Sequence, residues 1–418
     1  MLGVVAVACS AATSSSAPGR TSVTAPVATG RATRGASART VRIALAENQS
    51  QVRLTSASGW ELFAEDGRTA VALTKPGERW LLEREGTGIR AMREDSRPVS
   101  ARERIVVARP AVTDGDIAFN GRRYRGELTI TATADGLTVV NRLNMDDYLQ
   151  GVVPLEIGTS AVADAAAVEA QAVTARSYAV THLGSGGRLF DMRATVADQV
   201  YGGAGAESSV GNLAVHATTG LVLLYGGQVV NAPYSSTCGG STAEPQDVWR
   251  AGAEPYLKRV SDQIPGSTHF YCEGAPKYRW TRVFSRDALR ESIGRYVRTL
   301  PGGGTVSSVR SVTVSDVTPA GRVSTLTVET DRRALVLRGN EVRNALRLPS
   351  GEILYSTYFS VDAVAGRGEV ETLTLRGGGN GHGVGMCQAG AIGRARAGQD
   401  FRTILRTYYP GTTVGTLD

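Results

Sequence analysis

The chain has 418 residues, and its 46 Lys+Arg against 39 Asp+Glu give a formal net charge of +7. With 42% hydrophobic and 20% charged residues, its composition excludes wholesale disorder, and its length predicts two to three domains of about 150 residues each. The 50 glycines show no three-residue period, and no run approaches the ~20 apolar residues of a membrane span, so collagen and polytopic membrane proteins are excluded. Almost all cations are arginine, which indicates either a phosphate-binding surface or an arginine-biased genome; we favour the genome bias.

The first nine residues have the pattern of a bacterial lipoprotein signal. They form a short apolar run in which Ala6 and Ala8 precede Cys9. Cleavage before Cys9 would leave an acylated N-terminus held at a membrane surface. No Lys or Arg precedes the run, so we expect the true start to lie upstream; the alternative is a buried apolar N-terminus with an incidental cysteine.

Residues 10–40 predict a flexible tether, because they contain Ala, Ser, Thr, Gly, Pro and Arg but no acid and no apolar periodicity. We therefore expect an exported lipoprotein of the cell envelope, attached to a membrane through its N-terminus. Four arginines lie in the tether, which leaves only +3 for the chain from Val41 onward. No nucleic-acid partner is expected, and the tether is placed to meet anionic lipid or wall polymer.

Residues 41–140 predict a β-rich N-terminal region. Apolar and polar residues alternate in several short segments, which is typical of half-buried strands. Turn sequences such as Asn120-Gly121 and Asp135-Gly136 separate them. The strands are expected at 41–45, 60–63, 70–73 and 128–131.

Residues 141–418 predict a mixed body, so the fold class is α+β. The strongest helix signal is the Ala-rich segment 162–183, which lacks Gly and Pro. A strand is expected at 221–225, a helix at 285–299, further strands between 306 and 337, and a short helix at 338–346. The last 50 residues predict a Gly-rich loop and one more helix.

Several chemistries are excluded or weakened by missing motifs. The run 377–388 carries six glycines in its first nine positions but fits neither GxGxxG nor a phosphate loop. There is no HExxH pair for a helical zinc protease and no GxSxG for a serine hydrolase. Glu156 follows a buried-looking apolar stretch, and a carboxyl group in such surroundings has a raised pKa and can act as a general acid. His382 lies among the glycines of the run.

Three cysteines remain after Cys9, so at most one disulfide can form in the folded body. We predict a Cys238–Cys272 bridge, because both lie in Gly-containing loops of an exported protein. The alternative is zinc bound by Cys238 and Cys272 together with His382 or Cys387. No CxxC pair supports zinc, so no metal or other cofactor is the favoured prediction.

Seven motifs occur in the order seen in the SpoIID/LytB family, which the chain resembles over about residues 139–418. These are Tyr148-Leu-x-Gly-Val-Val-Pro-x-Glu156, Glu169-Ala-Gln-Ala-Val-Thr-Ala-Arg-Ser-Tyr-Ala179, Asp198-Gln-Val-Tyr-Gly-Gly203, Thr237-Cys-Gly-Gly-Ser-Thr242, Asp247-Val-Trp249, Gly381-His-Gly-Val-Gly-Met-Cys-Gln388 and Tyr408-Tyr-Pro-Gly-Thr412. The chain departs from the family where many members have His-Ser before the Cys-Gly-Gly motif, since it has Ser235-Ser236. It also has Ile157-Gly158 where many have Met-Pro.

The resemblance implies a SpoIID-like catalytic body that remodels peptidoglycan as a lytic transglycosylase. Glu156 would then cleave the MurNAc–GlcNAc bond and form 1,6-anhydroMurNAc. The usual hydrolases need a second acid, and Asp191 and Asp198 remain candidates for it. The alternative from the LytB side of the family is a non-catalytic, glycan-binding enhancer of a cell-wall amidase, and a third is a purely structural envelope lipoprotein.

The resemblance also implies that the other motif residues bind the glycan strand. Their amide, phenol, guanidinium and imidazole groups suit sugar hydroxyls and acetamido groups. For Arg176 the alternative is an ion pair with Glu169 or a bond to a buried carbonyl, and for Tyr201 it is a place in the core. The predicted substrate-binding residues are Gln171, Arg176, Tyr178, Gln199, Tyr201, His382 and Gln388.

Overall fold

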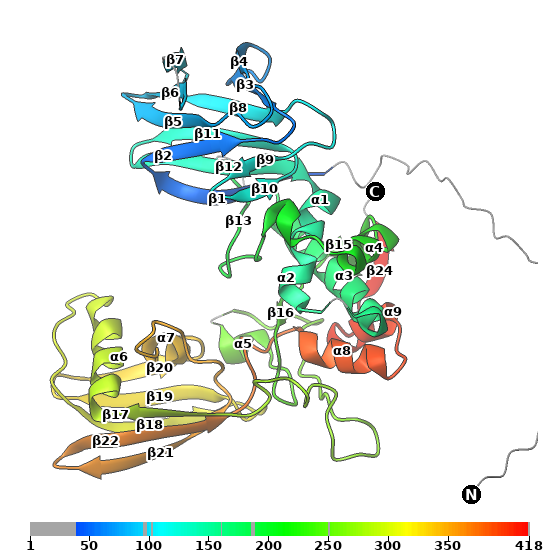
Figure 1. Cartoon of the computed structure of the whole chain (residues 1–418). Coiled ribbons are helices and arrows are strands. Elements are labelled where there is room, and N and C mark those ends of the chain that lie inside the picture. The colour runs from blue at the N-terminus through cyan, green and yellow to red at the C-terminus, as the bar shows by residue number, and fades with distance from the viewer. Residues whose placement is uncertain are drawn as a thin grey trace, which may run out of the picture. The chain divides into compact units, whose positions relative to one another are not determined.

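The computed structural model describes residues 39–94, 98–101, 103–159, 161–184, 189–249 and 251–416. The predicted signal at 1–9 with Cys9, and the predicted tether up to residue 38, lie outside the described residues. The region 41–140 is β-rich and the rest is mixed, so the predicted α+β class is confirmed (Figure 1).

Two sheets make up most of the N-terminal region. The seven-stranded sheet has the order β13-β1-β12-β11-β8-β3-β4, with β13 (Met192–Arg193), β1 (Thr40–Gln49), β12 (Gly136–Asn144), β11 (Glu127–Thr133), β8 (Ile105–Pro110), β3 (Trp60–Ala64) and β4 (Ala70–Leu73). The six-stranded sheet has the order β10-β9-β2-β5-β6-β7, with β10 (Arg122–Tyr124), β9 (Ile117–Phe119), β2 (Gln51–Thr55), β5 (Trp80–Glu85), β6 (Gly88–Arg93) and β7 (Pro98–Ala101). All four strand segments expected from the alternation are present.

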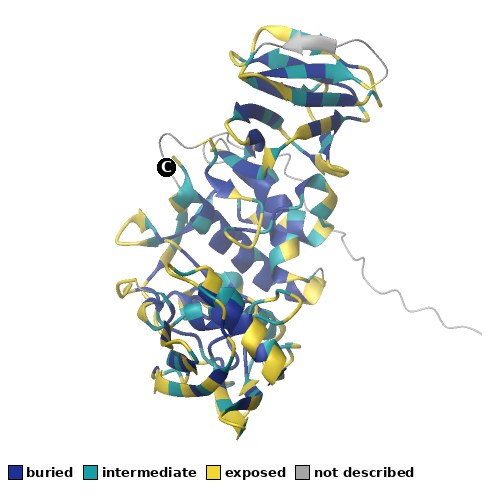
Figure 2. Ribbon diagram, turned by 90° about the vertical axis from the view of Figure 1, so that its left-hand side faces the viewer, coloured by how far each residue is buried: buried dark blue, intermediate teal, exposed yellow. Residues whose placement is uncertain are grey.

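The alternating residues of these strands form a shared core. In β3 buried and half-buried residues alternate. The Trp60 ring packs in an edge-to-face arrangement against the ring of Trp80 in the six-stranded sheet, with the ring centroids 6.0 Å apart. Figure 2 shows the sheets as mosaics of buried and more exposed residues, whereas the helices of the next region are largely buried.

The helices within residues 145–217 and 388–408 pack around one Ala-rich helix. Helix α3 (Ala165–His182), preceded by the 3-10 turn Val162–Asp164, confirms the predicted helix at 162–183. Its small side chains let other elements approach closely on most sides. These elements are α2 (Val153–Ile157), α4 (Ser209–Ala217), α8 (Gln388–Arg396), α9 (Phe401–Tyr408) and β14 (Leu221–Tyr225). Helix α1 (Met145–Gln150) contacts both α3 and strand β12 of the seven-stranded sheet.

The end of the chain contains two helices where one was predicted. Gly398 follows α8, and the Asp400 carboxylate accepts a hydrogen bond from the Thr403 amide at 2.7 Å, which starts α9 as a new helix. Two small sheets complete this region. They are β15-β14-β24, with β15 (Gln228–Val229) and β24 (Thr413–Thr416), and the parallel pair of β16 (Tyr234–Ser235) and β23 (Met386–Cys387).

Residues 280–375 form a hydrophobic core of their own. The helices α6 (Arg286–Arg298) and α7 (Glu341–Ala345) confirm the predictions at 285–299 and 338–346, and Ser285 caps α6. Two three-stranded sheets accompany them: β17-β22-β21, with β17 (Trp280–Ser285), β22 (Glu369–Gly377) and β21 (Phe359–Gly366), and β18-β19-β20, with β18 (Val309–Val317), β19 (Val323–Thr330) and β20 (Ala334–Arg338). The short helix α5 (Pro245–Val248) precedes this region.

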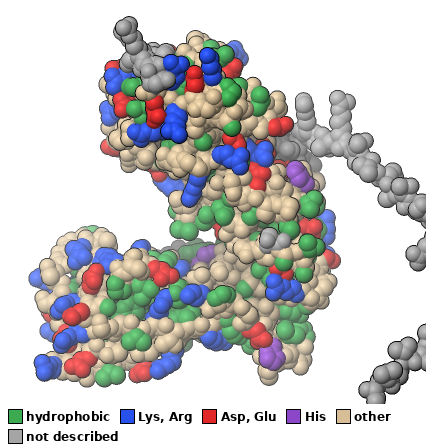
Figure 3. Space-filling view, in the orientation of Figure 1, with side chains coloured by type: hydrophobic (Ala, Val, Ile, Leu, Met, Phe, Trp, Pro, Cys, Tyr) green, Lys and Arg blue, Asp and Glu red, His purple; other side chains and the backbone are tan. Residues whose placement is uncertain are grey.

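Basic and acidic side chains are interspersed over the face shown in Figure 3. Many described arginines have an acidic partner, as Arg125 has in Glu207 at 2.6 Å and Arg396 has in Asp164 at 2.6 Å. Among the described helices, none alone has the length and apolar character to span a membrane; the bent pair Met145–Ile157 and Val162–His182 meets those two criteria only when joined.

Candidate active site

Four of the predicted site residues meet at a cavity of about 830 Å³. Of the predicted set, Glu156, Tyr178, His382 and Gln388 line it. They come from α2, from α3, from the Gly-rich run and from the start of α8. Other lining residues include Asp198, Tyr234, Trp249, Asn340, Arg343, Glu352 and Tyr355.

Glu156 is held in the cavity wall by backbone. It lies in the short helix α2, which has Pro154 in its first turn and ends at Gly158 in the left-handed conformation. The Val200 amide donates a hydrogen bond to Glu156 Oε1 at 2.7 Å. Burial raises the pKa of the Glu156 carboxyl, while hydrogen bonds from Val200 and the Tyr234 side chain oppose this shift. The net direction is upward, so Glu156 retains its proton to higher pH than an ordinary glutamate.

Gln199 lies behind the wall and fixes Tyr234. The Tyr148 hydroxyl donates to Gln199 Oε1 at 3.1 Å, and Gln199 Nε2 donates to the Tyr234 hydroxyl at 3.1 Å. Gln199 is fully buried, so its predicted contact with substrate is corrected to support of Tyr234. Tyr234 was missed from the sequence, although its place directly before Ser235-Ser236 and the Cys-Gly-Gly motif is a signal that could have found it.

A second buried glutamine, Gln171, supports the side chain of Gln388 at the cavity. Gln388 Nε2 donates to Gln171 Oε1 at 3.1 Å. Gln388 lines the cavity, but Gln171 is fully buried behind it. The predicted substrate-binding role of Gln171 is therefore corrected to positioning of the Gln388 amide.

His382 is a neutral imidazole in this site. The Val384 amide donates to His382 Nδ1 at 3.0 Å, which leaves the proton on Nε2. Burial, reinforced by the positive charge of Arg343, lowers the pKa of His382 to about 3. The ring lies 4.9 Å from that of Trp249. A hydrogen bond with the Tyr234 backbone opposes this downward shift of the pKa but does not outweigh burial, so His382 does not carry charge near neutral pH.

The structure places Arg176 and Tyr201 away from the cavity. Arg176 is 1% exposed, pairs with Asp146 at 2.9 Å and donates to the Thr218 carbonyl at 2.8 Å, so Glu169 is not its partner. Tyr201 is equally buried, and its hydroxyl donates to Asn141 Oδ1 at 2.8 Å. Their predicted substrate-binding roles are corrected to structural ones, because neither side chain lines the cavity.

The candidate second acids differ in position. Asp191 pairs with Arg42 at 2.6 Å and lies outside the cavity lining. Asp198 lines the cavity, but one oxygen accepts the Tyr178 hydroxyl at 3.5 Å and the other accepts the Arg193 amide at 2.8 Å. Glu352 at the cavity pairs with Arg282 at 3.6 Å. Glu156 is the lining acid whose pKa burial raises.

Five lining residues come from the region with its own core and were missed from the sequence: Asn340, Arg343, Glu352, Ile353 and Tyr355. Arg343 is held by the Leu354 carbonyl at 2.8 Å and by Asn340 Oδ1 at 3.0 Å. Burial lowers the pKa of Arg343 to about 10, which leaves it cationic at neutral pH. No motif marks these residues, because they reach the cavity through tertiary packing.

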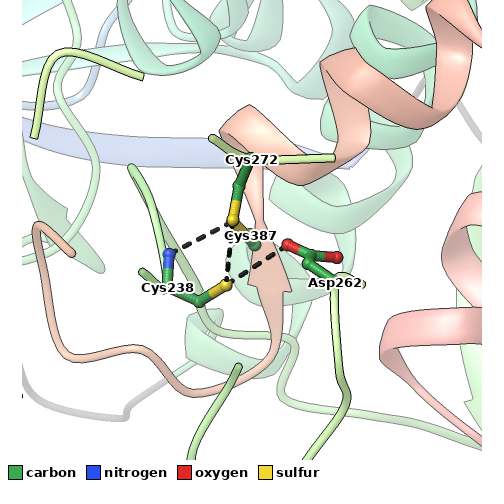
Figure 4. Close-up of side chains that lie close together, drawn as sticks. All are labelled: Cys238, Asp262, Cys272 and Cys387. Carbon is green, nitrogen blue, oxygen red and sulfur yellow. Dashed lines mark hydrogen bonds between the residues drawn. The ribbon is translucent and has the colours of Figure 1, made fainter. Parts of the chain in front are cut away.

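The cysteines do not form the predicted disulfide. Cys238, Cys272 and Cys387 are free thiols, and the Sγ atoms of Cys238 and Cys272 are 3.7 Å apart. Asp262, rather than His382, completes the group of potential metal ligands (Figure 4). The zinc alternative that included His382 is therefore corrected.

Two family models match the chain. One is SpoIID, described as stage II sporulation protein, over residues 133–225, and the other is a domain of unknown function over residues 264–385. Together with the relatives below and the fold around Glu156, the first match defines the class: the chain belongs to the SpoIID/LytB family. The second match includes the whole of the region with its own core, residues 280–375.

Three relatives show how far this likeness extends. An uncharacterized protein of Brachyspira hyodysenteriae is 30% identical over 304 residues, covering 72% of this chain and 75% of the relative. The amidase enhancer of Bacillus subtilis is 30% identical over 328 residues, covering 72% of this chain but 45% of the relative. Stage II sporulation protein D of Bacillus subtilis is 28% identical over 295 residues, covering 67% and 76%.

Proposed function

We propose that this protein is a lytic transglycosylase that cleaves MurNAc–GlcNAc bonds in the glycan strands of peptidoglycan. The observation that carries the proposal is the half-buried Glu156 at the wall of the cavity, with its pKa raised by burial and its position set by the Val200 amide. Such a carboxyl group can donate a proton near neutral pH.

In the proposed reaction, one carboxyl group performs both proton transfers. Neutral Glu156 protonates the glycosidic oxygen, and the bond from that oxygen to the muramyl anomeric carbon breaks. The Glu156 carboxylate then accepts the proton of the muramyl C6 hydroxyl, whose oxygen attacks the same anomeric carbon. The products are a free GlcNAc hydroxyl and a 1,6-anhydroMurNAc end, so Glu156 regains its proton and no water is consumed.

The other acids at the cavity support a transglycosylase over a hydrolase. A hydrolase of the usual kind needs a second carboxylate that activates water or attacks carbon. Both oxygens of Asp198 accept hydrogen bonds from the protein, and Glu352 is paired with Arg282. Neither carboxylate is hydrogen-bonded to Glu156, and neither accepts the Val200 amide that holds Glu156.

The lining suits a hydroxyl-rich ligand that also carries a carboxylate. Gln388 and neutral His382 provide hydrogen-bonding groups, and the Trp249 ring offers a flat apolar surface for a sugar face. Arg343 supplies a fixed positive charge. A lactyl or peptide carboxylate of muramic acid has the complementary charge.

A second candidate function is enhancement of a cell-wall amidase by a glycan-bound but non-catalytic protein. It is favoured by the likeness to the amidase enhancer of Bacillus subtilis, although the chain spans less than half of that relative. In that case the cavity would bind glycan and the protein would recruit the enzyme.

The two functions are separated by incubating the purified full chain with peptide-free glycan strands and analysing the products by mass spectrometry. We expect 1,6-anhydroMurNAc ends from the protein alone. If the protein binds strands without cleaving them, and instead stimulates an added amidase on intact peptidoglycan, the transglycosylase proposal fails and the enhancer proposal stands.

We also propose that the protein acts at the cell envelope as a lipoprotein acylated at Cys9. Metabolic labelling with a fatty acid tests this. Label is expected on the wild-type chain and not on Cys9→Ser, and an unlabelled wild type would contradict the proposal.

A further inference from the structure

A closed group of four ligand-bearing side chains lies close to the cavity but takes no part in it. Its members are Cys238, Asp262, Cys272 and Cys387, all buried, and their ligand atoms lie within 4.8 Å of one another. Figure 4 shows the three sulfur atoms and the Asp262 carboxylate pointing toward a common centre. We name these residues the cysteine cluster.

The spacing of the cysteine cluster suits tetrahedral zinc. A Zn–S bond of about 2.3 Å in tetrahedral geometry places two sulfur ligands about 3.8 Å apart. Cys238 Sγ and Cys272 Sγ are 3.7 Å apart, and Cys238 Sγ lies 3.2 Å from Asp262 Oδ2. A disulfide would require a sulfur separation of about 2.05 Å.

The charges around the cluster also match a bound dication. Zinc with three thiolates and one carboxylate leaves an excess of two negative charges, which are costly to bury without cations. Arg394 donates from Nη2 to Asp262 Oδ1 at 3.1 Å. Arg322 is 1% exposed and donates to the Cys238 carbonyl at 2.9 Å, and among the described residues no carboxylate forms an ion pair with it. The positive charges of these two guanidinium groups would balance the two excess negative charges of the zinc-bound cluster.

Arg322 is otherwise hard to explain. Its Nε and Nη1 atoms are buried without a hydrogen-bond partner, and a buried cation in that state is unfavourable unless negative charge lies nearby. Gly383 makes room for it, because a Cβ atom there would lie 2.4 Å from Arg322 Nη2. With three neutral thiols, this guanidinium would have only the Tyr358 ring at 6.0 Å and the electrostatic influence of Asp247 to favour its charge, whereas a thiolate–zinc centre would add negative charge beside it.

Neighbouring side chains and backbone amides hold the ligand atoms of the cluster in place by hydrogen bonds. Asp262 Oδ1 accepts from Arg394 and from the Tyr408 hydroxyl at 2.6 Å, which leaves Oδ2 facing the sulfur atoms. Cys387 caps α8, since its Sγ accepts the Gly390 amide at 3.3 Å. Partners of this kind fix ligand geometry and raise metal affinity.

From this geometry we infer that Cys238, Asp262, Cys272 and Cys387 form a structural zinc site. Four protein ligands close the coordination sphere, so the metal stabilises and does not catalyse. Asp262 and Cys272 belong to the segment 251–279, which has isolated bridges but no helix or named strand. Zinc would join this irregular segment to β23 and to the Cys-Gly-Gly motif beside the cavity.

The test is the zinc content of the purified full chain, measured by elemental mass spectrometry without chelator at any step. About one zinc ion per chain is expected for wild type, with Co²⁺ replacing it to give thiolate charge-transfer and tetrahedral visible bands. Cys272→Ser should lose the Co²⁺ charge-transfer intensity of one thiolate and most of the zinc. His382→Gln and the exposed His269→Gln should retain the metal, which separates this ligand set from one with His382 and from surface zinc.

A second variant covers the case in which Cys272→Ser does not fold. Arg394→Gln keeps all four ligands but removes the guanidinium group that donates to Asp262 Oδ1, and we expect zinc affinity in chelator competition to fall roughly 10- to 100-fold. Metal-free wild type with a Cys238–Cys272 disulfide in non-reducing peptide mapping would overturn the proposal. So would an Arg394→Gln affinity equal to that of wild type.

Discussion

The short parallel pair of β16 and β23 contributes to two contrasting sites. On the cavity side, Tyr234 and Ser235 line a space of about 830 Å³ together with the half-buried acid Glu156. Cys387, the partner of Ser235 in the pairing register, belongs instead to the fully buried cysteine cluster. One site is a cavity that polar and apolar side chains line together, and the other is closed and sulfur-rich.

This difference shows that residues of a single motif can serve separate purposes. In the run from Gly381 to Gln388, His382 and Gln388 face the cavity, whereas Cys387 faces the cluster. The same division appears in α3, where Tyr178 lines the cavity and the buried Arg176 pairs with Asp146.

Glu156→Gln should nearly abolish cleavage of glycan strands. The amide keeps the size of the side chain but cannot donate and then accept the proton, and general acid–base catalysis contributes typically about 10²- to 10⁴-fold. The measurement is the rate of formation of 1,6-anhydroMurNAc ends. Glu352→Gln is the matched control at the same cavity and should retain most activity; equal rates for Glu156→Gln and wild type would remove Glu156 from the catalytic role.

Arg176→Met should lower the stability rather than selectively lower the activity. It leaves Asp146 buried without its partner, and breaking a buried ion pair costs about 3–5 kcal/mol. Chemical denaturation measures the free energy of unfolding. Arg376→Met is the control, because its pair with Asp362 is exposed on both sides and should contribute about 0–1 kcal/mol. A fully stable Arg176→Met that no longer binds glycan would restore the substrate-binding role.

Tyr234→Phe should reduce cleavage about tenfold, the size expected for the loss of one useful hydrogen bond of about 1.4 kcal/mol at the acid. The Tyr234 hydroxyl opposes the upward pKa shift of Glu156, so its removal should raise the pKa further. The alkaline limb of the pH–rate profile should therefore move to higher pH. A limb that moves to lower pH would show that Tyr234 does not stabilise the carboxylate.

The smallest expected effect is a pH dependence of stability that originates at Glu156. Because its folded pKa lies above its unfolded pKa, its contribution is fully favourable below the unfolded pKa and is lost as the pH rises through the folded pKa. Denaturation across that window should show a slope that Glu156→Gln removes. An identical slope in wild type and variant would mean that Glu156 is not desolvated.

Local patterns predicted the elements well and their tertiary roles less well. The helix at 162–183 and the strands at 41–45 and 60–63 followed from composition and alternation, which act within a few residues. The same pattern could not show that Arg176 faces Asp146 and not Glu169, because the partner lies on another helix.

The candidate site was predictable where a motif coincides with the cavity, as for Glu156 and His382. It was not predictable where distant segments meet. Arg343 reaches the cavity from the region with its own core, and Asp262 joins the cysteines from an irregular segment with no periodicity. Such contacts depend on packing between elements and leave no spacing signal in the chain.

The most direct test of the central claim is cleavage of peptide-free glycan strands in water enriched in heavy oxygen. The muramyl C6 hydroxyl is the nucleophile in the proposed reaction, so the new ends should be 1,6-anhydroMurNAc without heavy oxygen, and Glu156→Gln should produce almost none. Reducing MurNAc ends that carry one heavy oxygen atom would show hydrolysis by water and contradict the account.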